Sequence, residues 1–167
     1  IVTKITEPNY HFVKVDIGAF GAPGICQDDN NVALLAGEPL LSDSNVSRTR
    51  DEDLRDIQQA IIRHKFDILT KSSGTFCAIN YDLVNNELTL IADKFGVRPI
   101  YFWIGDDFVV FSTALRILEE MALVPKSLDI VGTTETACFA FPLADRTPYL
   151  DIKTIRESEI VIISEKS

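Results

Sequence analysis

Three cysteines are the first residues of this sequence that could do chemistry, because a thiolate is a strong nucleophile. Cys26, Cys77 and Cys138 lie far apart, and none belongs to a Cys-x-x-Cys pattern. The two histidines, His11 and His64, are not next to any of them in the sequence, and two are too few for a histidine-rich metal site. A small buried hydrophobic side chain is the commoner role of such a cysteine. We therefore expect reduced thiols, as in a cytosolic protein.

A second candidate is the stretch "AGE", in which an apolar run ends at Gly37 and an acid follows. Glycine lets another group approach the backbone closely, so its neighbours can offer N–H groups to a ligand. Glu38 could then hold a ligand ammonium. The alternative is an ordinary junction between a strand and a turn, with Pro39 next. The acid cluster "RDED" (50–53) is typical of a helix start, and without further ligands it does not indicate a metal.

The elements that must position these residues follow from the apolar pattern. Residues 10–41 predict short strands and turns, with "NVALLAG" as a buried strand that ends at Gly37. A polar loop is expected at 42–48. Thr49 and Glu52 have the spacing of a capping box, which predicts a helix over about 51–66 with His64 at its edge.

Four strand-like runs come next, at 75–82, 87–93, 99–104 and 107–112, and their short connections predict an antiparallel meander. "PIYFW" and "FVVF" are apolar on both faces, which indicates a sheet covered on both sides. We therefore expect an α+β fold with mainly antiparallel sheets in four α/β/β/α layers. Helices are expected at 113–121 and 127–139, the second weakened by Gly132, and a final strand at 158–164.

Length and charge limit the classes of function. The 167 residues favour a single domain over 1–167, and a net charge of −9 would repel a phosphate backbone. No apolar run approaches the roughly 18 residues of a membrane span, and the first residues do not resemble a signal peptide. We expect a cytoplasmic protein that binds neither nucleic acid nor membrane.

The stretch "DKFGVRP" joins the second and third strand-like runs. Gly96 permits a tight turn, Pro99 presets the backbone at the start of a strand, and Asp93 could pair with Arg98. This pattern predicts a stiff turn without chemistry of its own.

The segment "GTFCAINYDLVNNELTLIADKFGVRPIYFWIGDDFVVFSTALRILEE" (74–120) resembles the class II glutamine amidotransferase domain of asparagine synthetases. The family has a strand, then an Arg-Asp-x-x-Gly-x-(Lys/Arg)-Pro-Leu-Tyr turn and a following strand. The residues of this chain that match these elements in order and spacing are Gly74, Phe76, Asp82, Asp93, Gly96, Arg98, Pro99 and Tyr101. "AGEPLL" resembles the family's Asn-Gly-Glu-Ile, and "RTPYLDIKTI" (146–155) resembles its Thr-(Leu/Ile)-Phe-x-Gly-Ile segment. The resemblance implies an N-terminal-nucleophile (Ntn) hydrolase fold in which the turn is a scaffold element.

The resemblance also assigns site residues. Gly37 and Glu38 match the family's oxyanion and substrate-amine positions, and Asp51 is a loose candidate for the acid that holds the substrate ammonium. Ala36 stands where the family has the Asn that donates to the oxyanion. An active member begins with a Cys whose own α-amine is the base, whereas this chain begins with Ile1, so no catalytic residue is expected in it.

This layout also resembles the cyclases of lasso peptides, whose shortened amidotransferase-like domain lacks the nucleophile. The leading hypothesis is a domain without glutaminase activity in an asparagine synthetase-like ATP-dependent amide ligase, used for docking or substrate positioning. One alternative is the active glutaminase domain of an asparagine synthetase whose Cys-first N-terminus is missing here. Another is a stand-alone amino-acid-binding module.

Cofactors and partners follow from the same resemblance. No cofactor or metal is expected in the chain, because the Ser-Gly-Gly-x-Asp-Ser nucleotide motif is absent from these residues. ATP and Mg²⁺ are implied for a synthetase domain. The expected partners are that synthetase domain, fused or separate, and a peptide or amino-acid substrate. A homodimer is also compatible with the sequence.

Overall fold

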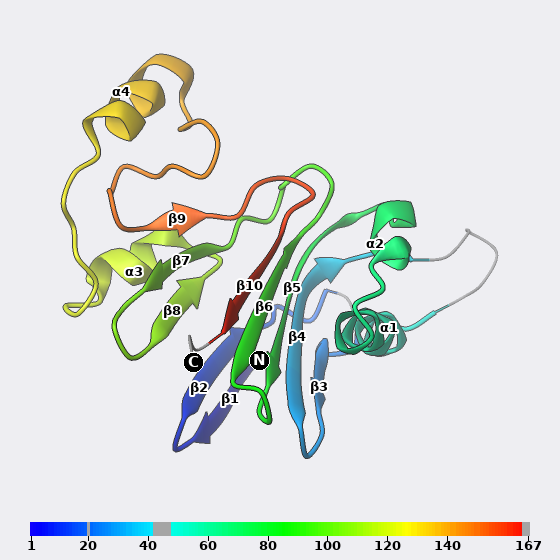
Figure 1. Ribbon diagram of the computed structural model, residues 1–167. Coiled ribbons are helices and arrows are strands. Elements are labelled where there is room, and N and C mark those ends of the chain that lie inside the picture. Colours follow the sequence, from blue (N-terminus) through cyan, green and yellow to red (C-terminus); the bar gives the residue numbers. More distant parts are fainter. Residues whose placement is uncertain (20, 42–47, 165–167) are drawn as a thin grey trace. The chain divides into compact units, whose positions relative to one another are not determined.

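The computed structural model describes residues 1–19, 21–41 and 48–164 (Figure 1). Most of the polar loop expected at 42–48 lies outside the described residues. The chain divides into two compact units, one of Ile1–Thr89 with the C-terminal end from Ile162 onward, and one of Leu90–Val161. Within the described ranges, no helix is long and apolar enough to cross a membrane.

The strands of the first unit lie in two sheets, and two strands of the larger sheet cross the boundary between the units. β1 (Val2–Glu7) and β2 (Tyr10–Val15) are an antiparallel pair. A five-stranded sheet has the order β10-β6-β5-β4-β3, with β3 (Ile25–Gln27), β4 (Asn31–Glu38), β5 (Thr75–Asp82), β6 (Glu87–Ala92) and β10 (Ile160–Ser164). β3, β4 and β5 are antiparallel neighbours. The strands expected near 31–37, 75–82, 87–93 and 158–164 are confirmed, whereas β1 was not predicted.

Helix α1 (Arg50–Ile62) packs against β3, β4 and β5 (Figure 1). The predicted capping box is confirmed, because the Thr49 side chain accepts from the Glu52 N–H and the Glu52 carboxylate accepts from the Thr49 N–H. Leu54, Ile57 and Ile61 are buried as their spacing predicts. These contacts hold the N-terminal end of α1 beside the sheet.

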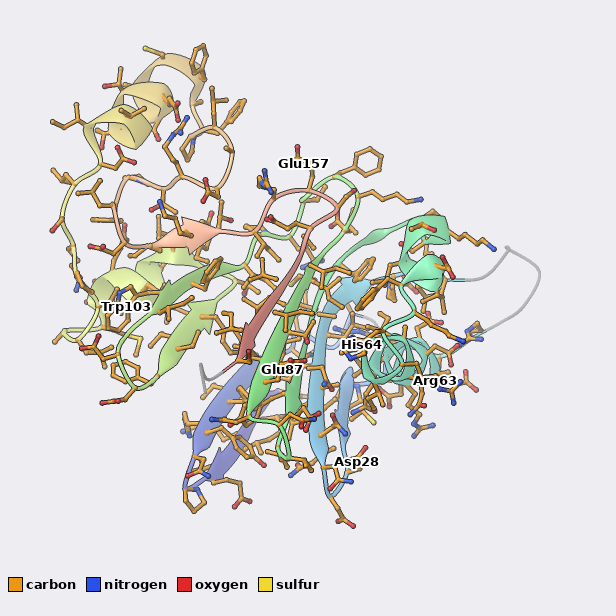
Figure 2. The ribbon with its side chains drawn as sticks, viewed as in Figure 1. Asp28, Arg63, His64, Glu87, Trp103 and Glu157 are labelled. Carbon is orange, nitrogen blue, oxygen red and sulfur yellow. The ribbon has the colours of Figure 1, made fainter. Side chains whose placement is uncertain are left out.

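The C-terminal end of α1 differs from the prediction, which placed His64 within the helix. The helix ends at Ile62, and the exposed His64 follows with a left-handed φ of 50° (Figure 2). Its N–H donates to Ile61 O at 2.9 Å, and the next N–H, of Lys65, donates to Ala60 O at 2.9 Å. This pair of bonds is a Schellman motif, which satisfies the last carbonyls and stops the helix. A short helix, α2 (Asp67–Lys71), then leads to β5.

The second unit contains a three-stranded sheet of order β8-β7-β9, with β7 (Tyr101–Ile104), β8 (Val109–Ser112) and β9 (Lys153–Thr154), and two helices, α3 (Leu115–Glu120) and α4 (Ile130–Phe139). Both helices were expected. Leu118, Val124 and Ile152 form its core. The prediction of one continuous four-stranded meander was wrong, because β6 and β7 belong to different sheets.

The turn after β6 is where the chain leaves one sheet for the other. The Asp93 side chain is 1% exposed and accepts from the Phe95 N–H at 2.8 Å and the Val97 N–H at 3.4 Å. The Asp93 carbonyl accepts from the N–H groups of Gly96 and Ser158. A buried carboxylate that bonds the N–H groups of its own turn supports that turn's conformation, and the stiffness of the turn stays a prediction. The Asp93–Arg98 pair stays a prediction.

The fold is a mixed α and β arrangement with mainly antiparallel sheets. The four-layer arrangement stays a prediction. β5 and β6 are largely buried, but the residues of β7 and β8 are half-buried and Ile104 is 53% exposed. The expectation that "PIYFW" and "FVVF" are covered on both sides was therefore too strong.

Candidate functional site

The end of β4 presents the first two residues of the candidate site. Gly37 is buried and pairs in register with Phe76 of β5, and its φ of 89° is one that L side chains rarely adopt. Glu38 pairs with Thr75, and its side chain is exposed. The strand ends one residue later, at Glu38, whose side chain lies at the surface of the first unit.

Gly74, directly before β5, lies against the backbone of Glu38. A Cβ placed on Gly74 would lie 2.3 Å from the Glu38 carbonyl oxygen, and Gly74 has a φ of 134°. The preceding N–H, of Ser73, donates to Leu40 O at 3.1 Å. Only a glycine lets the start of β5 run so close to Glu38, so the family-like Gly at this position has a packing reason.

Asp51 lies in the first turn of α1 and already has a partner. Its Oδ1 accepts from the Gly24 N–H at 3.1 Å, and Gly24 precedes β3 with a φ of 61°. The Gly24 carbonyl in turn accepts from the Leu35 N–H of β4. Asp51 therefore holds the turn beside β4, two residues before Gly37. This contact gives Asp51 a structural role, and the hold on the substrate ammonium that the resemblance implied stays a prediction.

Arg50 was missed by the sequence analysis and lies at the centre of this region. Its side chain is 3% exposed, and its guanidinium donates to Leu35 O at 2.7 Å and to Asp16 Oδ2 at 3.0 Å. Lys14 also donates to Asp16 Oδ2, at 2.7 Å. Helix starts favour acids, because the aligned backbone N–H groups carry partial positive charge. An arginine in the first position of "RDED" is therefore unexpected at a helix start, and it could have indicated a buried role for Arg50.

The charge at Asp16 follows from these contacts. The hydrogen bond from Lys14, with those from the Gly18 N–H and Arg50, lowers the pKa of Asp16 far below its usual range against the opposing effect of desolvation. The carboxylate therefore remains ionised between two cations. Because Lys14 and Arg50 outnumber it, this cluster carries one net positive charge in an acidic chain.

A cavity of about 320 Å³ lies beside this cluster. Among the described residues it is lined by Ile1, Thr3, Lys14, Asp16, Gly18, Gly21, Pro23 and Ile25. This volume suits a small ligand group. The described lining contains one hydroxyl, from Thr3, and one ion pair, between Lys14 and Asp16.

One of the three cysteines lies beside the Gly37–Glu38 end of β4, because Cys77 pairs in register with Ala36. Cys26 is half-buried and its thiol donates to Gln58 Oε1 at 3.4 Å, Cys77 is buried within β5, and Cys138 is exposed on α4. None of the three forms a disulfide. In the part of the chain that the structure describes, no group of three or more His, Cys, Asp and Glu could hold a metal ion.

Comparison with protein families places this geometry in a class. A family model described as a glutamine amidotransferase domain matches residues 41–167. The chain belongs to this family. The match includes Asp51 and the Asp93 turn, whereas Gly37 and Glu38 precede it. A comparison with curated proteins found no match.

Proposed function

We propose that this glutamine amidotransferase domain lacks glutaminase activity and belongs to an asparagine synthetase-like, ATP-dependent amide ligase. It docks beside the ligase's synthetase domain and positions a peptide or amino-acid substrate. In this proposal its sheets form the four layers of an Ntn hydrolase, and ATP and Mg²⁺ are bound by the synthetase domain. The likeness to lasso-peptide cyclases makes amide bond formation within a peptide one candidate reaction.

The proposal rests on the contacts and identities of the residues around the end of β4. Asp51, the candidate for the substrate ammonium, is engaged by the Gly24 N–H. Ala36 stands where the family has its oxyanion Asn, and its neighbour across the sheet is Cys77, which is 3% exposed. Losing one oxyanion donor typically lowers the rate about 10²–10³-fold. These residues favour binding over hydrolysis.

Glu38 supports the positioning role. Its exposed carboxylate lies on a backbone that Gly37 and Gly74 fix, and a fixed carboxylate can pair with the ammonium of an amino acid or peptide. The cavity belongs to the same unit, and its described lining includes the ion pair of Lys14 and Asp16.

The test is ammonia release from glutamine by the native polypeptide that carries this chain, with Glu38→Ala as the control. The proposal expects equal, background release from both proteins. Release that depends on Glu38 would refute the absence of glutaminase activity. ATP-dependent amide formation by the same polypeptide tests the ligase part separately.

The second candidate is the active glutaminase domain of an asparagine synthetase. It is favoured by the left-handed Gly37 and the exposed Glu38, which keep the family's order at the end of β4. It predicts that the native polypeptide begins with Cys, which N-terminal sequencing would show, and that glutamine hydrolysis is lost on removal of that residue.

A further inference from the structure

A second cavity of the first unit lies where three hairpin turns come together, at the lower end of the strands in Figure 1. The turns are those between β1 and β2, between β3 and β4, and between β5 and β6. The cavity has a volume of about 550 Å³, within the range of small-molecule sites. It lies at the start of β4, whereas the candidate site of Gly37 and Glu38 is at the end of that strand.

Backbone hydrogen bonds hold two of the three turns together. The Asp28 N–H donates to Asn31 O at 2.9 Å, and the Asp28 carboxylate accepts from the N–H groups of Asn30 and Asn31 at 2.9 and 2.8 Å. The Leu83 N–H, directly after β5, donates to Asn30 O at 2.8 Å and so joins this turn to the β5–β6 turn. The cavity therefore has preorganised walls, which lowers the cost of ordering them around a ligand.

Two tyrosines line the cavity and contact each other. The ring centroids of Tyr10 and Tyr81 lie 5.4 Å apart, with the ring planes at 65°. Phe12 is 7% exposed and supports both rings, at 5.2 Å from Tyr10 and 6.1 Å from Tyr81. The Tyr81 hydroxyl donates to the Asn86 side chain. The faces of such rings carry negative potential and attract a cation.

The charges around the cavity are all of one sign. Its described lining contains the carboxylates of Glu7, Asp28 and Asp29, and no lysine, arginine or histidine. Asp28 lies at the tip of the β3–β4 turn (Figure 2). A concave surface with charges of one sign concentrates ligands of the opposite sign. Within the described residues, no group of three acids could hold a metal ion, so these separated carboxylates suit an extended organic cation better.

We propose that this cavity binds the guanidinium of an arginine side chain in a peptide. A guanidinium can stack on an aromatic face while its N–H groups donate to carboxylates, whereas a lysine ammonium is a compact and strongly hydrated charge. Tyr10 and Tyr81 provide the aromatic faces. Glu7 and Asp29 accept the N–H groups, because the Asp28 carboxylate already bonds its own turn. The binding site does not depend on the reaction proposed above, since it needs neither ATP nor glutamine.

The first test is an NMR titration of the isotope-labelled chain with N-acetyl-arginine amide, at about 0.15 M salt to screen distant charges. Saturable shifts of the amide resonances that line the cavity are expected, with a Kd of about 1 mM or lower. N-acetyl-citrulline amide has the same shape without the charge and should bind about tenfold more weakly or worse. Free arginine should also bind more weakly, because its α-carboxylate is repelled.

Three results of this titration would overturn the proposal. They are the absence of saturable shifts at the cavity, equal binding of the citrulline derivative, and equal binding of N-acetyl-lysine amide. Free arginine that binds more tightly than the amide would overturn the peptide as the source of the guanidinium.

Variants of the lining test the roles of the carboxylates and the rings. Glu7→Gln combined with Asp29→Asn should weaken binding about tenfold, because each exposed ion pair is worth up to about fivefold. The matched control is Asp106→Asn combined with Asp107→Asn, two exposed residues between β7 and β8, which removes the same charge and should leave binding unchanged. Equal effects of the two double changes would overturn the proposal.

Tyr10 provides an independent readout of the aromatic contact. Tyr10→Leu should weaken binding about three- to fivefold, whereas Tyr10→Phe keeps the ring and should bind as the unchanged chain does. Binding that is the same in all three proteins would contradict a guanidinium stacked at this wall.

Discussion

Replacement of Arg50 by Met tests the buried charge cluster most directly. The guanidinium donates to Leu35 O of β4 and to Asp16, and its side chain is 3% exposed. Removing one partner of a buried ion pair costs about 3–5 kcal/mol. Because Lys14 remains 2.7 Å from Asp16, the carboxylate keeps one cation, so we expect the lower end of that range, about 3 kcal/mol.

The assay is urea unfolding of the chain, with thermal unfolding as a second measure. A loss of this size lowers the Tm by about 6–12 °C in a chain of this length. The matched control is Arg55→Met, on the exposed side of α1, which should change the free energy of unfolding by less than about 0.5 kcal/mol. If Arg50→Met and Arg55→Met lie within about 1 kcal/mol of each other, Arg50 does not hold β4 to the cluster and the reasoning fails.

Three further predictions concern the same unit. Because the pKa of Asp16 is lowered in the folded state, its contribution to stability is complete above the unfolded pKa of about 3.9 and is lost as the pH falls below it. Asp16→Asn should therefore flatten the dependence of unfolding free energy on pH below about pH 4, and an unchanged slope would contradict this. Gly74→Ala should lower the free energy of unfolding by more than about 2 kcal/mol, because the new Cβ meets Glu38 O. Gly18→Ala should lower it by about 1 kcal/mol, because its Cβ meets no atom within 4 Å. Equal losses of stability in urea unfolding would contradict the close approach of Gly74 to Glu38. Thr49→Ala should cost about 1 kcal/mol by removing the N-cap of α1, with a matching loss of helical circular dichroism on warming, and no change would mean that tertiary packing alone holds the helix end.

The α1 helix shows how far local rules carry a prediction and where they stop. Its start was predictable, because the capping box between Thr49 and Glu52 needs only neighbouring residues. Its end was not, because a histidine takes the left-handed position where a glycine is usual. The apolar spacing continued past Ile61 and suggested a longer helix.

The candidate site shows the same division. The sequence suggested Gly37, Glu38 and Asp51, but it could not show that the Asp51 carboxylate is engaged by Gly24, 27 residues away in the chain. Nor could it show that Arg50 reaches β4 and Asp16. Such contacts depend on how the turn before β3 packs on the helix start, and no local pattern encodes that packing.

The sequence by itself determined most of the strands, most helices and the family-like turn, because burial alternation, caps and Gly or Pro positions act over a few residues. The tertiary structure decided that β6 and β7 enter different sheets, since "IADKFGVRPIYFW" is equally compatible with a hairpin. The turn between them is bonded to a distant part of the chain, because the N–H of Ser158, 65 residues after Asp93, donates to the Asp93 carbonyl at 2.9 Å. The residues of a strand determine its extended conformation, but its pairing with other strands depends on backbone groups that are distant in the sequence. Those contacts form only when the chain folds.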